Sequence, residues 1–173
     1  MPETSPLLLL HSEIDQRVQS ILENHPDWIC GKGCDLCCRR LAEIPPLTTA
    51  EWDLLQAGLA ALPLLQRQEI GERVDALAEQ ASRPIVCPFL DQNTGACPVY
   101  LHRPVACRSY GFYVQRELGL YCHEIESRVA TGTLSDVVWG NHDAIDQRLT
   151  RLGESRPLTE WFTAWAQTAG FRI

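Results

Sequence analysis

Apolar residues recur at helical spacing in the first part of this chain. Within Ser12–Asn24 they stand at positions i, i+4, i+7 and i+8, and polar residues fill most of the other positions. Ser12 can cap the first turn, and Pro26 follows the last one. The pattern predicts an amphipathic helix whose apolar face consists of Ile14, Val18, Ile21 and Leu22.

The same spacing predicts two helices in the middle of the chain. The first begins with the capping box Thr48-Thr49-Ala50-Glu51 and is stopped by Pro63. The second extends over about Leu64 to Ala81, and we expect the pair to form a hairpin. Their predicted buried residues are Trp52, Leu55, Leu59 and Leu62 in the first helix and Ile70, Val74 and Leu77 in the second.

The segment that follows, Pro84 to Cys122, has no sustained period. Turn-forming residues fill Asp91 to Gly95. Short apolar runs at Tyr110–Val114 and Leu118–Tyr121 predict a small β-hairpin. This segment is therefore expected to be irregular and rich in turns.

Helical spacing returns near the C-terminus, in Asn141–Leu152 and in Leu158–Ala169, the second of which is closed by Gly170. We expect the large apolar residues of the last helix to pack on the core. Together these elements predict a mainly α fold with small irregular or β-hairpin elements. The three core residues predicted in the last helix are Trp161, Phe162 and Trp165.

Composition narrows the class of protein. The chain has 173 residues, 45% of them hydrophobic, which suits one compact domain over residues 1–173. A formal net charge of -7 argues against a nucleic-acid partner and against binding to an anionic membrane. The N-terminal segment lacks a secretory signal, because only four leucines, Leu7 to Leu10, follow a polar start. No stretch is long enough to span a bilayer, so we expect a cytoplasmic protein with reduced thiols.

Eight cysteines change the picture most. Four of them crowd into Cys30–Cys38, and the others are dispersed farther along the chain. Reduced thiols at such density are typical of binding to a soft metal ion, whereas an even cysteine count also permits a disulfide framework. Gly31 and Gly33 would let the loop curl around an ion. The predicted ligands are Cys30, Cys34, Cys37, Cys38, Cys87, Cys97, Cys107 and Cys122.

The metal-binding region is assigned to residues 28–125, with a C-terminal helical extension over 126–173. The compact helical domain would thus be organised around cysteine-rich metal-binding loops. Basic residues near the thiols would balance the negative charge of metal-bound sulfur. They are Lys32, Arg39, Arg40, Arg103 and Arg108.

The spacing bears on the kind of metal. Structural zinc usually takes two short-spaced pairs of ligands, and this chain has no second short-spaced pair. Three close cysteines with a remote Cys-Pro are nearer to iron–sulfur ligation, and the chain contains Cys87-Pro88 and Cys97-Pro98. Adjacent residues rarely bind one tetrahedral ion, so one thiol of Cys37-Cys38 could serve another site or bridge two metals. One metal site and two sites both remain open, with an iron–sulfur cluster of the 4Fe–4S type favoured slightly over zinc.

Histidines contribute less to the argument. His123 follows Cys122, and His102 lies between two cysteines, so each could ligate a metal or hydrogen-bond a sulfur. A surface or capping role is the simpler interpretation for both. No histidine has a clear relation to one cysteine, so the catalytic residues, if there are any, are not identified.

Three sequence blocks together resemble a known family. They are Cys30 to Cys38, then Cys87 to Tyr100, then Arg103-Pro104-Val105-Ala106-Cys107-Arg108. The chain is similar to the cysteine-cluster proteins described as a zinc- or iron-chelating domain, the CxxCxxCC or YkgJ-type family. Its first block has three residues after Cys30 where that family has two. The resemblance implies metal chelation by the matching cysteines and places Tyr100, Arg103 and Arg108 beside the bound group.

Three functions are compatible with such a centre. The first is a redox or cluster-dependent protein, such as part of an iron–sulfur oxidoreductase or of a protein-modifying system. The second is a non-catalytic zinc module that folds on metal and presents its helices to a protein partner. The third is metal trafficking, for which Cys37-Cys38 could provide exchangeable ligands.

Overall fold

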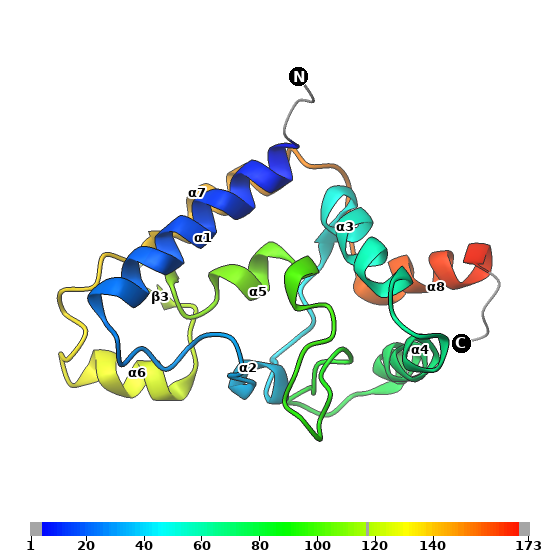
Figure 1. Ribbon diagram of the computed structural model, residues 1–173, viewed down its shortest axis with the longest axis horizontal. Coiled ribbons are helices and arrows are strands. Elements are labelled where there is room, and N and C mark those ends of the chain that lie inside the picture. Colours follow the sequence, from blue (N-terminus) through cyan, green and yellow to red (C-terminus); the bar gives the residue numbers. More distant parts are fainter. Residues whose placement is uncertain (1–4, 117, 170–173) are drawn as a thin grey trace. The chain divides into compact units, whose positions relative to one another are not determined.

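The structure is a computed structural model that describes residues 5–116 and 118–169 (Figure 1). More than half of these residues are helical, and each strand has only two or three residues, which confirms the mainly α fold class. The chain divides into two compact units. The first contains the residues up to Cys34 and Val105–Leu152, and the second contains Asp35–Pro104 and the segment that begins at Gly153. No helix in the described ranges has both the length and the apolar character needed to cross a membrane.

The longest helix, α1 (Pro6–Asn24), belongs to the first unit. Proline fits its first turn, where backbone N–H groups have no helical partner. The predicted start at Ser12 is wrong, whereas the predicted end at Asn24 is confirmed. The start was missed because four consecutive leucines show no helical period in the sequence. In the structure, Leu7 and Leu10 are buried, whereas Leu8 and Leu9 are exposed. The buried residues of α1 are Leu7, Leu10, His11, Ile14 and Ile21.

Two short helices pack along α1. Helix α5 (Val105–Ser109) contacts it, and α7 (His142–Leu149) runs beside it in Figure 1. An ion pair between Arg148 of α7 and Glu13 of α1 joins these two helices. The hydrogen bond from Arg148 lowers the pKa of Glu13. Helix α7 is shorter than the predicted Asn141–Leu152, because Asn141 is its N-cap and the helix ends at Leu149.

A small sheet completes the first unit. Strand β2 (Tyr113–Gln115) lies in its centre, antiparallel to β3 (Leu118–Gly119) and parallel to β4 (Gly140–Asn141). The β2–β3 pairing confirms the predicted hairpin. Helix α6 (His123–Ala130) was not predicted, because Ile125 is its one buried residue and a single apolar position gives no helical period.

The second unit is built on helices α3 (Thr49–Ala60), α4 (Leu64–Glu79) and α8 (Leu158–Ala169). The capping box of α3 is confirmed: the Thr48 hydroxyl accepts from Glu51 N, and the Glu51 carboxylate accepts from Thr48 N. Strands β1 (Leu47–Thr48) and β5 (Ser155–Arg156) pair antiparallel and thus bring the C-terminal segment to α3. The remaining helical elements of this unit are α2 (Leu36–Arg39) and the 3-10 turn η1 (Tyr100–His102).

One apolar core joins these three helices, and α4 and α8 lie against each other. The Trp161 ring stacks on Trp52 at 6.0 Å between centroids, and its Nε1 donates to the Leu47 carbonyl at 2.9 Å. The prediction that the last helix packs on the core is therefore confirmed, whereas its closing residue, Gly170, lies outside the described residues. The core consists of Leu47, Trp52, Leu55, Leu59, Ile70, Val74, Phe89, Val99, Leu158, Phe162 and Trp165.

The single-domain organisation stays a prediction. The predicted extension over 126–173 does not pack as one piece within a unit: 126–152 belongs to the first unit, and the residues from Gly153 onward belong to the second.

The contact between α3 and η1 depends on a glycine. A Cβ added at Gly58 would lie 2.5 Å from Cγ of His102, so the imidazole ring packs directly on the helix backbone. Alanine is favoured over glycine in a helix by about 1 kcal/mol, so any loss of stability in Gly58→Ala reports this clash. We expect the free energy of unfolding in urea to fall by about 1–3 kcal/mol. Gly31→Ala is the control, because a Cβ there meets nothing within 4 Å; equal stability of both variants would contradict the prediction.

Candidate metal centre

The eight cysteines are divided evenly between the two units, and all eight are free thiols. The disulfide framework that the even count permitted is therefore not formed. The first unit holds Cys30, Cys34, Cys107 and Cys122, and the second holds Cys37, Cys38, Cys87 and Cys97.

In the second unit the backbone brings two cysteine segments together. Helix α2 carries Cys37 and Cys38, and the residues after it pair with the chain around Cys87. An isolated antiparallel bridge joins Leu41 to Ile85, and Cys87 N donates to the Cys38 carbonyl at 2.7 Å. The segments that carry Cys38 and Cys87 are thus in contact, although α3 and α4 lie between them along the chain.

The thiols of this unit are linked to one another through hydrogen bonds. One side-chain hydrogen bond joins Cys37 and Cys38, and another joins Cys38 and Cys87. The bond with Cys38, followed by burial, raises the pKa of Cys37. The bond with Cys37 lowers the pKa of Cys38, but the bond with Cys87 and burial outweigh it and raise this pKa to about 12. The thiols of Cys37 and Cys38 therefore keep their protons at neutral pH until a cation replaces them.

Cys97 adds a fourth sulfur to the group and acts electrostatically on Cys38. Burial raises the pKa of the Cys97 thiol, while the N–H of Val99 and the charge of Arg103 act in the opposite direction. The guanidinium of Arg103 lies 3.5 Å from the centroid of the Tyr100 ring, and its Nε donates to the Tyr100 carbonyl at 2.9 Å. Tyr100 and Arg103 thus lie on the same turn as Cys97, because Tyr100 N donates to the Cys97 carbonyl.

The four cysteines of the first unit have different surroundings. The Cys30 thiol lies 3.7 Å from the Tyr110 carbonyl oxygen and packs on the backbone of Gly111. Cys107 is exposed on α5, and Cys122 is the N-cap residue of α6. Arg108 does not extend into solvent: its side chain is 11% exposed and pairs with Asp15 of α1 at 3.1 Å.

The glycines and histidines near the cysteines lie in different surroundings. Of the two loop glycines, Gly33 adopts a left-handed backbone with φ of 98°, as predicted, and Gly31 does not. The ring of His102 packs on Gly58 of α3, and His123 is exposed in the first turn of α6. His123 therefore has the surface position that the simpler interpretation predicts, whereas the packing of His102 on α3 was not predicted.

Sequence reasoning treated Arg39 only as a nearby charge and missed Asp35. The two residues flank the cysteine pair of α2, and Arg39 Nε donates to Asp35 Oδ2 at 2.7 Å. Their i, i+4 spacing was the available signal, because residues so spaced face each other on a helix.

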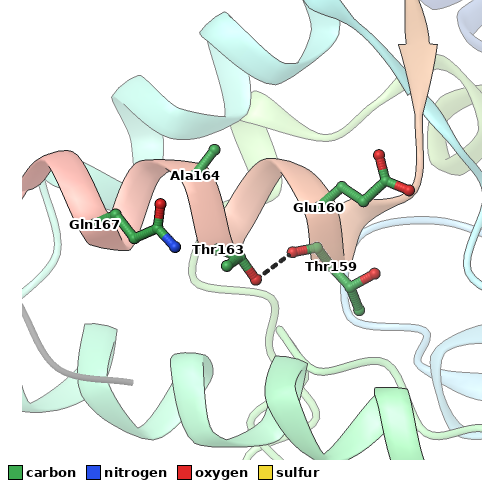
Figure 2. A pocket seen from close by; sticks show the side chains of 5 residues that line it. All are labelled: Thr159, Glu160, Thr163, Ala164 and Gln167. Carbon is green, nitrogen blue, oxygen red and sulfur yellow. Dashed lines mark hydrogen bonds between the residues drawn. The ribbon is translucent and has the colours of Figure 1, made fainter.

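A separate hollow lies on the surface of α8 (Figure 2). Threonine, glutamate, alanine and glutamine line it, and the Thr163 hydroxyl donates to the Thr159 carbonyl at 2.8 Å. Hydroxyl and amide groups are poor partners for a thiophilic metal. The hollow is therefore distinct from the cysteine centre. Its lining residues are Thr159, Glu160, Thr163, Ala164 and Gln167.

The donor set of the second unit fits zinc or iron chemically, because both metals are bound by soft thiolate sulfur. The side chain of Cys38 interacts with those of Cys37 and Cys87 and, electrostatically, with that of Cys97. Within residues 5–116 and 118–169, no three histidine, cysteine or acidic side chains form a ready set of metal ligands.

Four reduced thiols gathered from distant segments of a mainly helical chain define a class of cysteine-cluster metal-binding proteins. Residues 29–128 match the model of one family in it, described as "CxxCxxCC: Putative zinc- or iron-chelating domain". That match spans more than half of the chain, so the chain belongs to this family. No curated protein and no solved structure gives a significant match to it.

Thiol reactivity provides a test of these surroundings. In the reduced, metal-free chain we expect N-ethylmaleimide to modify the exposed Cys107 first. Cys37 and Cys97 should react slowly, because their raised pKa values leave little of the nucleophilic thiolate at neutral pH. Mass spectrometry of peptides over a time course measures the order. Labelling of Cys37 or Cys97 as fast as Cys107 would show that the thiols are not packed in this way.

Proposed function

We propose that this chain is an iron–sulfur protein and that Cys37, Cys38, Cys87 and Cys97 supply thiolates to its cluster. The observation that carries this proposal is the pairing of two cysteine segments, in which Cys87 N donates to the Cys38 carbonyl at 2.7 Å. The side chain of Cys38 also interacts with those of Cys37, Cys87 and Cys97. A thiolate-bound cluster supplies reversible one-electron transfer when it is present. The chain would serve as a redox or cluster-dependent component.

The surroundings of these thiols support iron–sulfur over zinc. Each of the two remote cysteines precedes a proline, and the first segment presents its cysteines within a single loop and turn. The sulfur of Cys97 accepts a backbone N–H bond and lies near the charge of Arg103. Hydrogen bonds and cations at sulfur stabilise the added negative charge of a reduced cluster, and so they raise its reduction potential.

The other predicted site residues are not ligands of the proposed cluster in the second unit. Cys30, Cys34, Cys107 and Cys122 remain predicted ligands, as the family pattern implies. Tyr100 would act by holding Arg103, whose guanidinium stacks on its ring. Arg108 belongs to the first unit and pairs there with Asp15 of α1.

Anaerobic purification tests the proposed function. We expect a brown protein with iron and inorganic sulfide in similar amounts and with visible sulfur-to-iron charge-transfer absorption. Cys38→Ser and Cys87→Ser should each lose most of this absorption, because each removes a thiolate ligand. Cys107→Ser is the comparison, since it removes the exposed thiol of the first unit. Colourless protein that carries stoichiometric zinc would contradict the iron–sulfur assignment.

A structural zinc module is the second candidate, and one packing observation favours it. Cys87 and Cys97 pack against the apolar core of the second unit, so a metal bound there would be coupled directly to folding. In this function the metal would stabilise helices that a protein partner recognises.

Metal removal separates the two candidates. If zinc is structural, a chelator should lower the melting temperature in proportion to the lost binding energy, with about 4 kcal/mol expected when free metal is 1,000 times its dissociation constant. Circular dichroism during heating measures this change, and no redox transition should accompany it. An unchanged melting temperature after complete metal removal would exclude a structural role.

A further inference from the structure

We infer that Asp35, Arg39 and Gly95 form a clamp that positions the paired cysteines of α2 against the segment that carries Cys97. This inference rests on the proposed function, because it concerns how the same thiolate centre is assembled. None of the three residues is a metal ligand in the proposal. Each would act through the cysteines that it holds.

The first half of the clamp is the ion pair across α2. Asp35 is the N-cap residue of this helix, and Arg39 is its last residue. Arg39 Nε donates to Asp35 Oδ2 at 2.7 Å, so the pair spans the whole helix and closes over the turn that carries Cys37 and Cys38. A four-residue helix has almost no intrinsic stability, so a side-chain contact across it matters more than in a long helix.

The second half is the contact with the turn at residues 91–96. Arg39 uses a second nitrogen, Nη2, to donate to the Gln92 carbonyl at 3.3 Å. Asp35 lies against the other end of the same turn, where a Cβ added at Gly95 would be 2.9 Å from its Oδ2. Both ends of α2 therefore contact one turn, and the cysteine pair lies between the two contacts.

The turn itself is well defined, so it can serve as a fixed support. The Asp91 carboxylate accepts from Asn93 N at 2.9 Å, and the backbones of Asp91 and Ala96 are joined by a bond of 2.9 Å. Gly95 has φ of 70°, a left-handed conformation that residues with a Cβ rarely adopt. Cys97 follows this turn directly, so the clamp ties the position of Cys37 and Cys38 to that of Cys97.

The opposite side of α2 is held independently. There the Leu41–Ile85 bridge and the bond from Cys87 N to the Cys38 carbonyl join the helix to the Cys87 segment. The clamp supplies the corresponding attachment on the Cys97 side. The short helix is thus attached to both segments that carry the remote cysteines.

Cobalt binding tests the clamp. The full chain, reduced and free of metal, is titrated with Co²⁺ without oxygen against a competing chelator, and visible absorption reports the thiolate ligand field. We expect Arg39→Gln and Asp35→Asn each to weaken Co²⁺ binding by about 10- to 100-fold and to change the band pattern. The double variant should lose no more than either single one, because the two residues act as a pair. Gly95→Ala should weaken binding too, through the clash with Asp35.

Arg156→Gln is the matched control. It breaks another short-range arginine–carboxylate pair of the second unit, with Glu154 at 2.6 Å and a similar exposure of the arginine. We expect its Co²⁺ affinity to equal that of the unchanged chain. The melting temperature of the metal-free Asp35 and Arg39 variants should also be unchanged, because their ion pair is partly exposed.

The outcomes distinguish this inference from the proposed function. If the unchanged chain binds Co²⁺ with thiolate absorption and the Asp35 and Arg39 variants bind it equally well, the clamp is refuted and the centre stands. If the unchanged chain gives no thiolate absorption with Co²⁺, the centre is refuted, and the clamp with it. Equal weakening in Arg156→Gln would show a general effect of surface charge and would also refute the clamp.

Discussion

The proposed centre of the second unit depends on interactions among its cysteine side chains, because Cys38 interacts with Cys37, Cys87 and Cys97. As neutral thiols they can form hydrogen bonds, which join Cys38 to Cys37 and to Cys87. As thiolates they would repel one another in a partly buried site, where water screens charge poorly. Only a cation of high affinity for sulfur removes that repulsion and keeps the sulfurs together. Because the pKa values of Cys37 and Cys38 are raised, a metal that binds there must displace their protons.

Holding the sulfurs at this distance is the task of the backbone around them. Two of the cysteines lie in α2, which is too short to be stable alone. Its contacts come from outside: the Leu41–Ile85 bridge and the bond from Arg39 to the Gln92 carbonyl. The remote cysteines in turn pack on the core that α3, α4 and α8 form. The proposed metal centre would thus be continuous with the core, because Cys87 and Cys97 pack against it.

The sequence predicted the elements that have their own local signal. The capping box at Thr48 and the apolar face of α3 gave a helix that the structure confirms, and so did the spacing of α8. Helix α6 lacked such a signal, because it buries one residue, and the first turns of α1 were hidden in a run of leucines. Cysteine spacing predicted a metal-binding region, but not which of the eight cysteines would belong to the same unit. That choice is made by pairings between distant segments, such as Cys38 with Cys87, which no local pattern encodes.

The order of segments in the second unit explains why its core and its thiols depend on each other. The Cys87–Cys97 segment follows α4, and its Phe89 and Val99 enter the same core as Phe162 of α8. Helix α8 reaches that core through the β1–β5 pair, more than 50 residues after Cys97 along the chain. Because Phe89 and Val99 lie beside the remote cysteines, displacement of α8 would loosen the support of Cys87 and Cys97. Conversely, a metal that joins these cysteines to α2 would restrain the segment on which α8 packs, so binding and core packing must stabilise each other.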